Sequence, residues 1–237
     1  MAGATHPARP RTVLLTRPRA QAEAFGARLT PLGWTPIIAP LQAISFAESP
    51  PPLLDEARAL LFTSQNGVAA FARLCPSRDL PALCVGPNTA KAARDAGFVA
   101  LEGPGQAQGL APWAAQHSRG PVLHCRGAHS TGDLVSDFAA EGVLLHSHTL
   151  YTQTALPLEA HARDALNSGR VGVLMVFSPR SARLLGQATA GITTALPLTL
   201  CLSQAVANAL NFQAAPEILI AEQPNGDSML VALQTVY

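Results

Sequence analysis

One local plan recurs along this chain: a short apolar run, a turn of small polar residues, then an amphipathic stretch. The first apolar run covers residues 12–16, and Ala22, Phe25 and Leu29 follow at spacings that place them on one helix face. Strands alternating with helices in this way are typical of parallel sheets covered by helices on both faces. Five more units of this kind begin at Ala59, Ala82, Pro121, Val173 and Leu198.

The number of expected strands favours two domains. Additional strands are predicted at residues 35–38, 98–101, 143–148 and 217–221, which brings the total to about ten. Two groups of about five strands suit a pair of small doubly wound α/β domains. A single closed eight-fold barrel is the alternative at this chain length.

The two halves of the sequence also resemble each other. VLLTRPRA resembles VLHCRGAH, LLFTSQNG resembles MVFSPRSA, and VGPNTAKAA resembles LSQAVANAL, with nearly the same separation in each pair. A nearly constant separation favours a duplicated domain. Chance similarity among strand–helix units is the alternative interpretation.

Composition excludes several classes of protein. Hydrophobic residues make up 48% and charged residues 13%, which favours a folded core over a disordered chain. The net charge of +1 provides no strong field for a polyanion, so no nucleic-acid partner is expected. No apolar run is long enough to cross a membrane, and residues 1–11 read as a loose tail without the apolar segment of a secretory signal. Four scattered cysteines without a C-x-x-C pair favour a reduced, cytoplasmic protein.

Small polar residues follow most of the predicted strands. In doubly wound sheets, ligands bind beyond the carboxyl ends of the strands, where such residues offer hydroxyls and helix N-termini to an anion. For any single loop, helix capping alone is the alternative reading. No loop matches a phosphate-binding fingerprint, so no nucleotide cofactor is expected. The loops are Thr16–Arg17, Thr63–Asn66, Gly86–Thr89, Arg126–Gly127, Ser178–Ser181 and the turn at Ser203.

The sequence offers few candidates for catalysis. His124, His129, His146 and His148 lie close together, but no further ligands are specified, so they are interpreted as partly exposed strand-end histidines and no metal is expected. Tyr151 follows a strand at a junction, where its phenol can donate a proton or a hydrogen bond. A half-buried interface tyrosine is the alternative.

Six segments, taken together and in order, resemble the uroporphyrinogen-III synthases: LLTRP, LLFTSQNGVAAF, VGPNTAKAARDAGF, LHCRG, LYTQTA and VFSPRSA. The resemblance implies two flavodoxin-like doubly wound α/β domains with parallel sheets, joined by a two-stranded linker. Residues 1–40 with 152–237 would form the first domain and residues 44–148 the second. Residues 41–43 and 149–151 would be the linkers.

The same resemblance implies an activity. These lyases of porphyrin and heme biosynthesis cyclise hydroxymethylbilane to uroporphyrinogen III, losing water and inverting ring D through a spiro intermediate, with no cofactor or metal. Tyr151 matches the tyrosine proposed to assist loss of water. The substrate, a linear tetrapyrrole with carboxylates on every ring, would lie in an interdomain cleft of a monomer. Its expected binding residues are Arg17, Thr63, Ser64, Asn66, Asn88, Thr89, Arg126, Gly127, Ser178, Arg180, Ser181 and Ser203.

One departure from the family pattern and two rival functions remain. Where relatives can carry hydroxyls, this chain has Ala205 and Val206, which weakens the case for side-chain contacts from that loop. A non-catalytic, two-lobed anion-binding module would share the architecture. A flavin-binding flavodoxin-like protein would need a phosphate loop near Thr16, and TRPRA makes a poor one.

Overall fold

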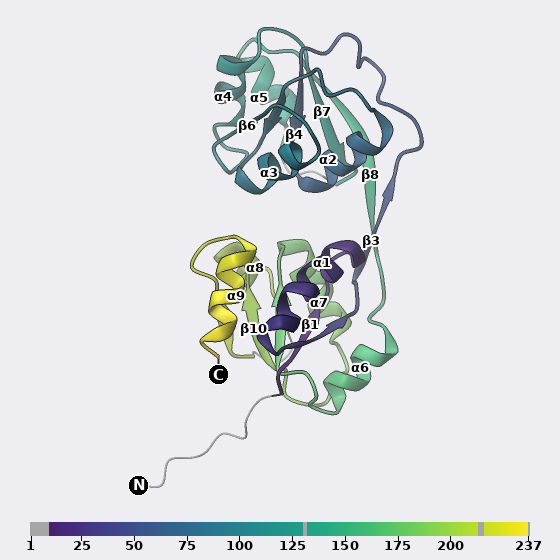
Figure 1. Cartoon of the computed structure of the whole chain (residues 1–237), viewed down its shortest axis with the longest axis vertical. Coiled ribbons are helices and arrows are strands. Elements are labelled where there is room, and N and C mark those ends of the chain that lie inside the picture. The colour runs from purple at the N-terminus through teal and green to yellow at the C-terminus, as the bar shows by residue number, and fades with distance from the viewer. Residues whose placement is uncertain (1–9, 130–131, 213–215, 237) are drawn as a thin grey trace. The chain divides into compact units, whose positions relative to one another are not determined.

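The computed structural model of this chain describes residues 10–129, 132–212 and 216–236. The chain divides into two compact units, Met1–Ala43 with Thr154–Tyr237 (unit 1) and Ile44–Gln153 (unit 2). Each unit is an open sheet with helices on both faces (Figure 1), so the closed-barrel alternative is wrong. Residues 41–43, expected as a linker, fall in unit 1, and residues 149–151 fall in unit 2. Most of the expected N-terminal tail lies outside the described residues.

Unit 1 is built on a five-stranded parallel sheet in the order β11-β10-β9-β1-β2. Alternation along β1 sends Leu14 to the face covered by α6, α7 and α8, and Leu15 to the face covered by α1 and α9. The strands are β1 (Thr12–Leu15), β2 (Thr35–Ile38), β9 (Val173–Val176), β10 (Leu198–Cys201) and β11 (Ile218–Ile220). The helices are α1 (Arg19–Leu29), η1 (Thr30–Leu32), α6 (Ala160–Asn167), α7 (Pro179–Ala188), α8 (Gln204–Asn208) and α9 (Gly226–Gln234).

Unit 2 is built on a six-stranded sheet in the order β3-β8-β7-β4-β5-β6. The expectation of five strands in each domain is therefore wrong for this unit, because the edge strand β3 also joins the sheet beside β8. The strands are β3 (Gln42–Phe46), β4 (Ala59–Phe62), β5 (Ala82–Cys84), β6 (Ala100–Glu102), β7 (Val122–Gly127) and β8 (Leu145–Ala155). The helices are α2 (Gln65–Leu74), α3 (Pro87–Asp95), α4 (Leu110–His117) and α5 (Leu134–Ala140).

The two sheets share one strand order, which supports the internal duplication. Without β3, the order β8-β7-β4-β5-β6 in unit 2 corresponds to β2-β1-β9-β10-β11 in unit 1. The similar sequence pairs fall on the corresponding elements: VLLTRPRA with VLHCRGAH on β1 and β7, and LLFTSQNG with MVFSPRSA on β4 and β9. Two strands also run from one unit into the other, β3 from unit 1 and β8 from unit 2, and these form the two-stranded linker.

Local chemistry explains where the helices begin and end. Ser64 and Ser178 cap α2 and α7, each accepting a hydrogen bond from a backbone N–H in the first turn. Gly33 ends the α1–η1 segment with a φ of 78°, a conformation that favours glycine.

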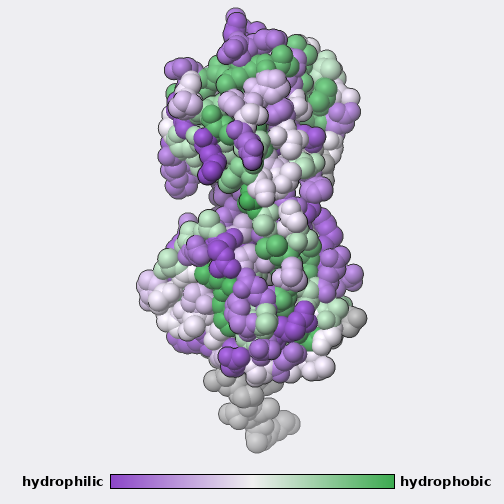
Figure 2. Space-filling view, turned by 90° about the vertical axis from the view of Figure 1, so that its right-hand side faces the viewer, coloured by the Kyte–Doolittle hydropathy of each residue, from purple (hydrophilic) through white to green (hydrophobic). Residues whose placement is uncertain are grey.

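On the face shown in Figure 2, hydrophilic residues are interspersed with smaller hydrophobic areas. The four cysteines are buried and free. Among the described residues, no helix is both long and apolar enough to span a membrane.

Candidate active site

The strand order places one switch point in each sheet. In unit 2 the chain proceeds from β4 through β5 to β6 on one side, and from β7 to β8 on the other, so the order reverses between β4 and β7. The corresponding point in unit 1 lies between β9 and β1. Ligands of doubly wound sheets bind beyond the carboxyl ends of the strands at such points. The predicted residues Thr63, Ser64, Arg126 and Gly127 lie at the first point, and Arg17 and Ser178 lie at the second.

At the switch point of unit 2, Tyr151 is hydrogen-bonded to Ser64. The Tyr151 Oη and Ser64 Oγ atoms are 2.8 Å apart, and the tyrosine side chain is 8% exposed. Ser64 Oγ also accepts a hydrogen bond from the Gly67 N–H at 3.2 Å. Because its oxygen already accepts from the backbone, Ser64 can direct its own hydrogen to Tyr151 Oη. The phenol hydrogen is then available to a third group.

An irregularity in β8 aims Tyr151 at Ser64. Thr149 pairs with Arg126 and Tyr151 pairs with Gly127, so Leu150 is an extra residue between two consecutive partners. Leu150 and Tyr151 consequently pack in the same cluster, together with residues of α2 and α3, whereas regular alternation would separate them. Extra residues of this kind are often found beside active sites, where they redirect a side chain.

The position of Tyr151 depends on a glycine. A Cβ atom on Gly127 would lie 2.7 Å from two carbons of the Tyr151 ring and 2.9 Å from its Oη. The Ala128 N–H also donates to the Tyr151 carbonyl at 2.9 Å. Gly127 was predicted as a substrate-binding residue, and the structure shows that it makes room for the tyrosine.

The environment of Tyr151 keeps its phenol protonated. Burial raises the pKa of Tyr151, and the hydrogen bond from Ser64 offsets part of that rise. At neutral pH the Tyr151 side chain is therefore a hydrogen-bond donor. Ser64 is placed to stabilise negative charge that develops on the Tyr151 oxygen.

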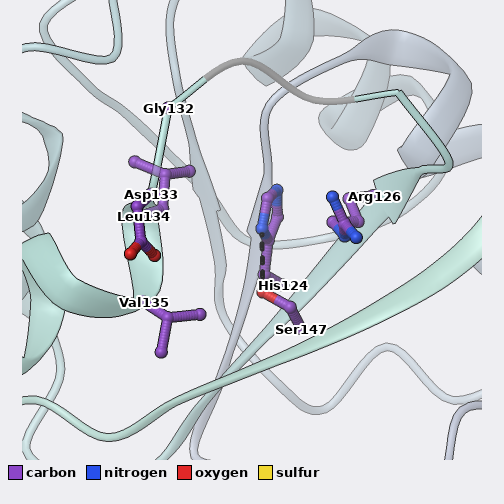
Figure 3. Close-up of a pocket in the computed structure, with 7 residues that line it drawn as sticks. All are labelled: His124, Arg126, Gly132, Asp133, Leu134, Val135 and Ser147. Atoms are coloured by element: carbon purple, nitrogen blue, oxygen red, sulfur yellow. Dashed lines mark hydrogen bonds between the residues drawn. The ribbon is translucent and has the colours of Figure 1, made fainter.

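The other face of β7 carries a second polar cluster beside a cavity of about 180 Å³ (Figure 3). His124 is 2% exposed, with Nε2 at 3.0 Å from Thr63 Oγ1 and Nδ1 at 3.4 Å from Ser147 Oγ. Burial and the positive charge of Arg126 lower the pKa of His124 to about 4. The ring is therefore neutral at physiological pH and holds the two hydroxyls on either side.

The histidines give no sign of a metal centre in the described part of the chain. No group of three or more His, Cys, Asp or Glu side chains there is arranged to hold an ion. The interpretation of partly exposed strand-end histidines is wrong for His124, because the ring lies inside the unit.

The cavity beside His124 has charges of both signs on its walls. Arg126 lies on the β7 side, and Asp133 lies at the start of α5, across the cavity from His124 in Figure 3. Asp133 is committed to its own helix, since it accepts from Ser136 Oγ at 2.6 Å and from the Ser136 N–H at 3.2 Å. These hydrogen bonds lower the pKa of Asp133.

At the switch point of unit 1, Arg17 follows β1 and Ser178 follows β9. These two loops correspond to the loops after β7 and β4 in unit 2. The Arg17 guanidinium lies 4.3 Å above the Phe177 ring and donates to Gln21 at 3.3 Å. Burial lowers the pKa of Arg17 to about 10, so the side chain is still a cation at neutral pH. Ser178 Oγ accepts from the Ser181 N–H at 3.1 Å and lies 2.9 Å from Ser181 Oγ.

The other predicted binding residues lie in, or directly before, the first turns of helices α2, α3, α7 and α8. Thr89 is buried in the first turn of α3, and Asn88 beside it is exposed. Ser203 precedes α8 without making a side-chain cap, and the residues that follow it offer no hydroxyls. Asn66 and Arg180 lie in the first turns of α2 and α7. Substrate binding by each residue of the set stays a prediction.

Two residues of these clusters were not predicted from the sequence. Gln42 is buried at the start of β3 and donates a hydrogen bond to Ser181 Oγ. Ser147, on β8, lies beside His124 of β7. Each is a polar residue within a predominantly apolar or mixed strand, and only the sheet register shows what it contacts. An isolated glutamine in PLQAI was the one available signal.

Comparisons with known proteins agree on one family. The sequence model of the family described as "Uroporphyrinogen-III synthase HemD" matches residues 23–231. The uroporphyrinogen-III synthetase structure from Helicobacter pylori has a TM-score of 0.64 at 19% identity, covering 97% of this chain and 100% of that one. A mutant uroporphyrinogen III synthase from the extremely thermophilic bacterium Thermus thermophilus has a TM-score of 0.59 at 22% identity, covering 94% and 99%. At these identities the structures show a shared fold. No curated protein sequence matches the chain significantly.

Proposed function

The chain belongs to the uroporphyrinogen-III synthase family, a family of lyases in tetrapyrrole biosynthesis, and we propose that Tyr151 is the proton donor of its reaction. The substrate of that reaction is hydroxymethylbilane, and its terminal hydroxyl must leave as water. The observation that carries the proposal is the 2.8 Å contact between Tyr151 Oη and Ser64 Oγ, with Ser64 itself held by the Gly67 N–H.

The proposed step moves one proton. Tyr151 donates its phenol hydrogen to the departing hydroxyl, the C–O bond breaks, and water, an electrophilic azafulvenium cation and the Tyr151 phenolate result. Ser64 donates its hydrogen bond to the phenolate oxygen as charge develops there. The substituted carbon of ring D then attacks to form the spiro intermediate, which fragments and closes with ring D reversed. The proton released at closure returns to Tyr151, so the enzyme ends in its starting state.

Binding of the substrate is proposed to use the polar groups at the two switch points. The substrate carries carboxylates on every ring, and guanidinium groups and hydroxyls are suited to hold them. Arg126 in unit 2 and Arg17 in unit 1 occupy corresponding places in the duplicated fold, which supports a shared role in anion binding. A linear chain held at several points favours the attack that inverts ring D over direct closure.

The proposal includes a cytoplasmic, monomeric enzyme that acts on a small molecule and binds neither nucleic acid nor membranes. Support comes from the balanced charge of +1 and from the four free, buried thiols. Light scattering coupled to gel filtration, at the concentration used for assays, measures the oligomeric state directly.

The test of the proposal is the Tyr151→Phe variant. The substitution removes one hydroxyl from a well-packed ring, so the melting temperature should change little. We expect uroporphyrinogen III to form at least about tenfold more slowly, since general acid catalysis contributes about 10²–10⁴-fold. Spontaneous closure should then take a larger share, and the product should shift toward isomer I. A folded variant with the wild-type rate and isomer ratio would contradict the assignment.

A further inference from the structure

A buried glutamine is hydrogen-bonded to the helix that begins at the unit 1 switch point. Gln42 opens β3 at the end of the unit 1 segment and is only 4% exposed. Its Nε2 donates to Ser181 Oγ at 3.1 Å, although the two residues are 139 positions apart in the sequence. Ser181 is itself buried in the first turn of α7. The contact therefore joins the linker strand to the start of the helix that Ser178 caps.

The hydrogen bonds around Ser181 have a direction. Gln42 donates to Ser181 Oγ, so the Ser181 hydroxyl can send its own hydrogen to Ser178 Oγ, 2.9 Å away. Ser178 Oγ also accepts from the Ser181 N–H at 3.1 Å. With two donors already directed at its oxygen, the hydrogen of Ser178 is left to point away from the helix. The chain of donors thus starts at the Gln42 amide and ends at the Ser178 hydroxyl.

Two buried atoms at this point lack a protein partner among the described residues, Gln42 Oε1 and Thr16 Oγ1. Thr16 is 1% exposed and follows β1, and alternation places it on the same face as Leu14, the face that α7 covers. Buried polar atoms are nearly always hydrogen-bonded, so each of these two atoms is available to a polar ligand or water. The nearby Arg17 provides a cation at the same edge of the sheet.

We propose that Gln42 is a positioning residue, which fixes the Ser178 hydroxyl as a donor to one carboxylate arm of the linear tetrapyrrole. Only the identity of that ligand rests on the proposed function, because the direction of the donor chain follows from the contacts themselves. Gln42 itself does not contact the substrate and acts through Ser181. Its role differs from that of an ordinary buried glutamine, because the identity of its terminal group decides which way the hydroxyls point.

The decisive substitution is Gln42→Glu, which keeps the shape and reverses the direction. A carboxylate only accepts hydrogen bonds, so Ser181 would turn its hydrogen toward residue 42 and no longer supply Ser178. Gln42→Met removes the donor without adding a charge, which separates the reversal from simple repulsion of an anion. Gln187→Glu is the matched control, because it adds the same charge at an exposed position further along α7.

The measurement is a ¹⁵N–¹H NMR titration of the full chain with sodium propionate, a mimic of one acid arm. In the wild type, the amide signals of Ser178 and Ser181 should shift with propionate. We expect binding to weaken by about tenfold or more in Gln42→Glu, by several-fold in Gln42→Met, and not at all in Gln187→Glu. With hydroxymethylbilane, the loss should appear in KM with little change in kcat.

The outcomes separate this inference from the proposed function. If propionate leaves the Ser178 and Ser181 signals unmoved in the wild type, or binds both Gln42 variants as it binds the control, the inference is wrong. If Gln42→Glu does not fold, Gln42→Met alone decides between these results. A normal rate in Tyr151→Phe together with weakened propionate binding in the Gln42 variants would refute the proton donor and leave the positioning role standing.

Discussion

The neutral ring of His124 predicts a specific dependence of stability on pH. Its pKa falls from the ordinary 6.5 to about 4 in the folded chain, because the ring is buried and Arg126 is close. The unfolded chain takes up a proton as the pH drops below about 6.5, whereas the folded chain resists until about pH 4. The stability that the neutral ring allows is therefore complete at pH 7 and is lost progressively between these values. At about 1.4 kcal/mol for each pKa unit, the loss amounts to about 3 kcal/mol by pH 4.

The assay compares the wild type with His124→Gln, which keeps polar contacts but does not titrate. The chain has two tryptophans, Trp34 in unit 1 and Trp113 in α4 of unit 2, so a Trp34→Phe background leaves a fluorescence signal for unit 2 alone. Urea unfolding at pH 7 and pH 4 then gives the free energy of unfolding of that unit. We expect the difference between the two pH values to be smaller by about 3 kcal/mol in His124→Gln.

The control for this prediction is His129→Leu. His129 is an exposed residue of the same unit, so this variant controls for the loss of an imidazole that is not buried. An equal pH dependence in the wild type and in His124→Gln would show that the ring is not held neutral. The account of the Thr63–His124–Ser147 cluster would then be refuted.

Two further predictions concern glycines around Tyr151. Gly127→Ala should displace the Tyr151 ring, since the added Cβ would lie 2.7 Å from it; we expect about 1–3 kcal/mol of lost stability and a lower rate, measured by urea unfolding and by the synthase assay. Gly67→Ala places a Cβ 2.5 Å from the Cys125 carbonyl oxygen and should cost at least as much, because a rigid backbone atom cannot move aside as a side chain can. Full stability in either variant, by the same unfolding measurement, would contradict the packing described for this site.

Much of the fold followed from periodicity. Alternating apolar runs and amphipathic stretches predicted two sheets of parallel strands, and the resemblance between halves placed corresponding strands correctly, β1 with β7 and β4 with β9. The family resemblance predicted a two-stranded linker at residues 41–43 and 149–151, and β3 does lie beside β8. Periodicity did not reveal that β3 also counts as a sixth strand of the unit 2 sheet, because joining a sheet depends on the neighbour that an edge strand finds.

The candidate site was predictable in its residue types and unpredictable in its contacts. Ser64 and Tyr151 were both identified from the sequence, but their hydrogen bond depends on an extra residue in β8, which alternation alone does not reveal. His124 was considered as a metal ligand because of its neighbours in sequence, whereas the sheet places it between Thr63 and Ser147. Gln42 was missed because its partner lies on a helix that begins more than a hundred residues later.

In the proposed mechanism Ser64 acts on the reaction through the Tyr151 phenol, and a double-mutant cycle tests this role. Single-turnover rates with hydroxymethylbilane are measured for the wild type, Ser64→Ala, Tyr151→Phe and the double variant. The cost of losing the Ser64 cap on α2 is present in both backgrounds and cancels in the cycle. We predict that Ser64→Ala slows the chemical step much more in the wild type than once Tyr151 is phenylalanine. Equal effects of Ser64→Ala in the two backgrounds would contradict a donor chain from Ser64 through Tyr151 to the leaving hydroxyl.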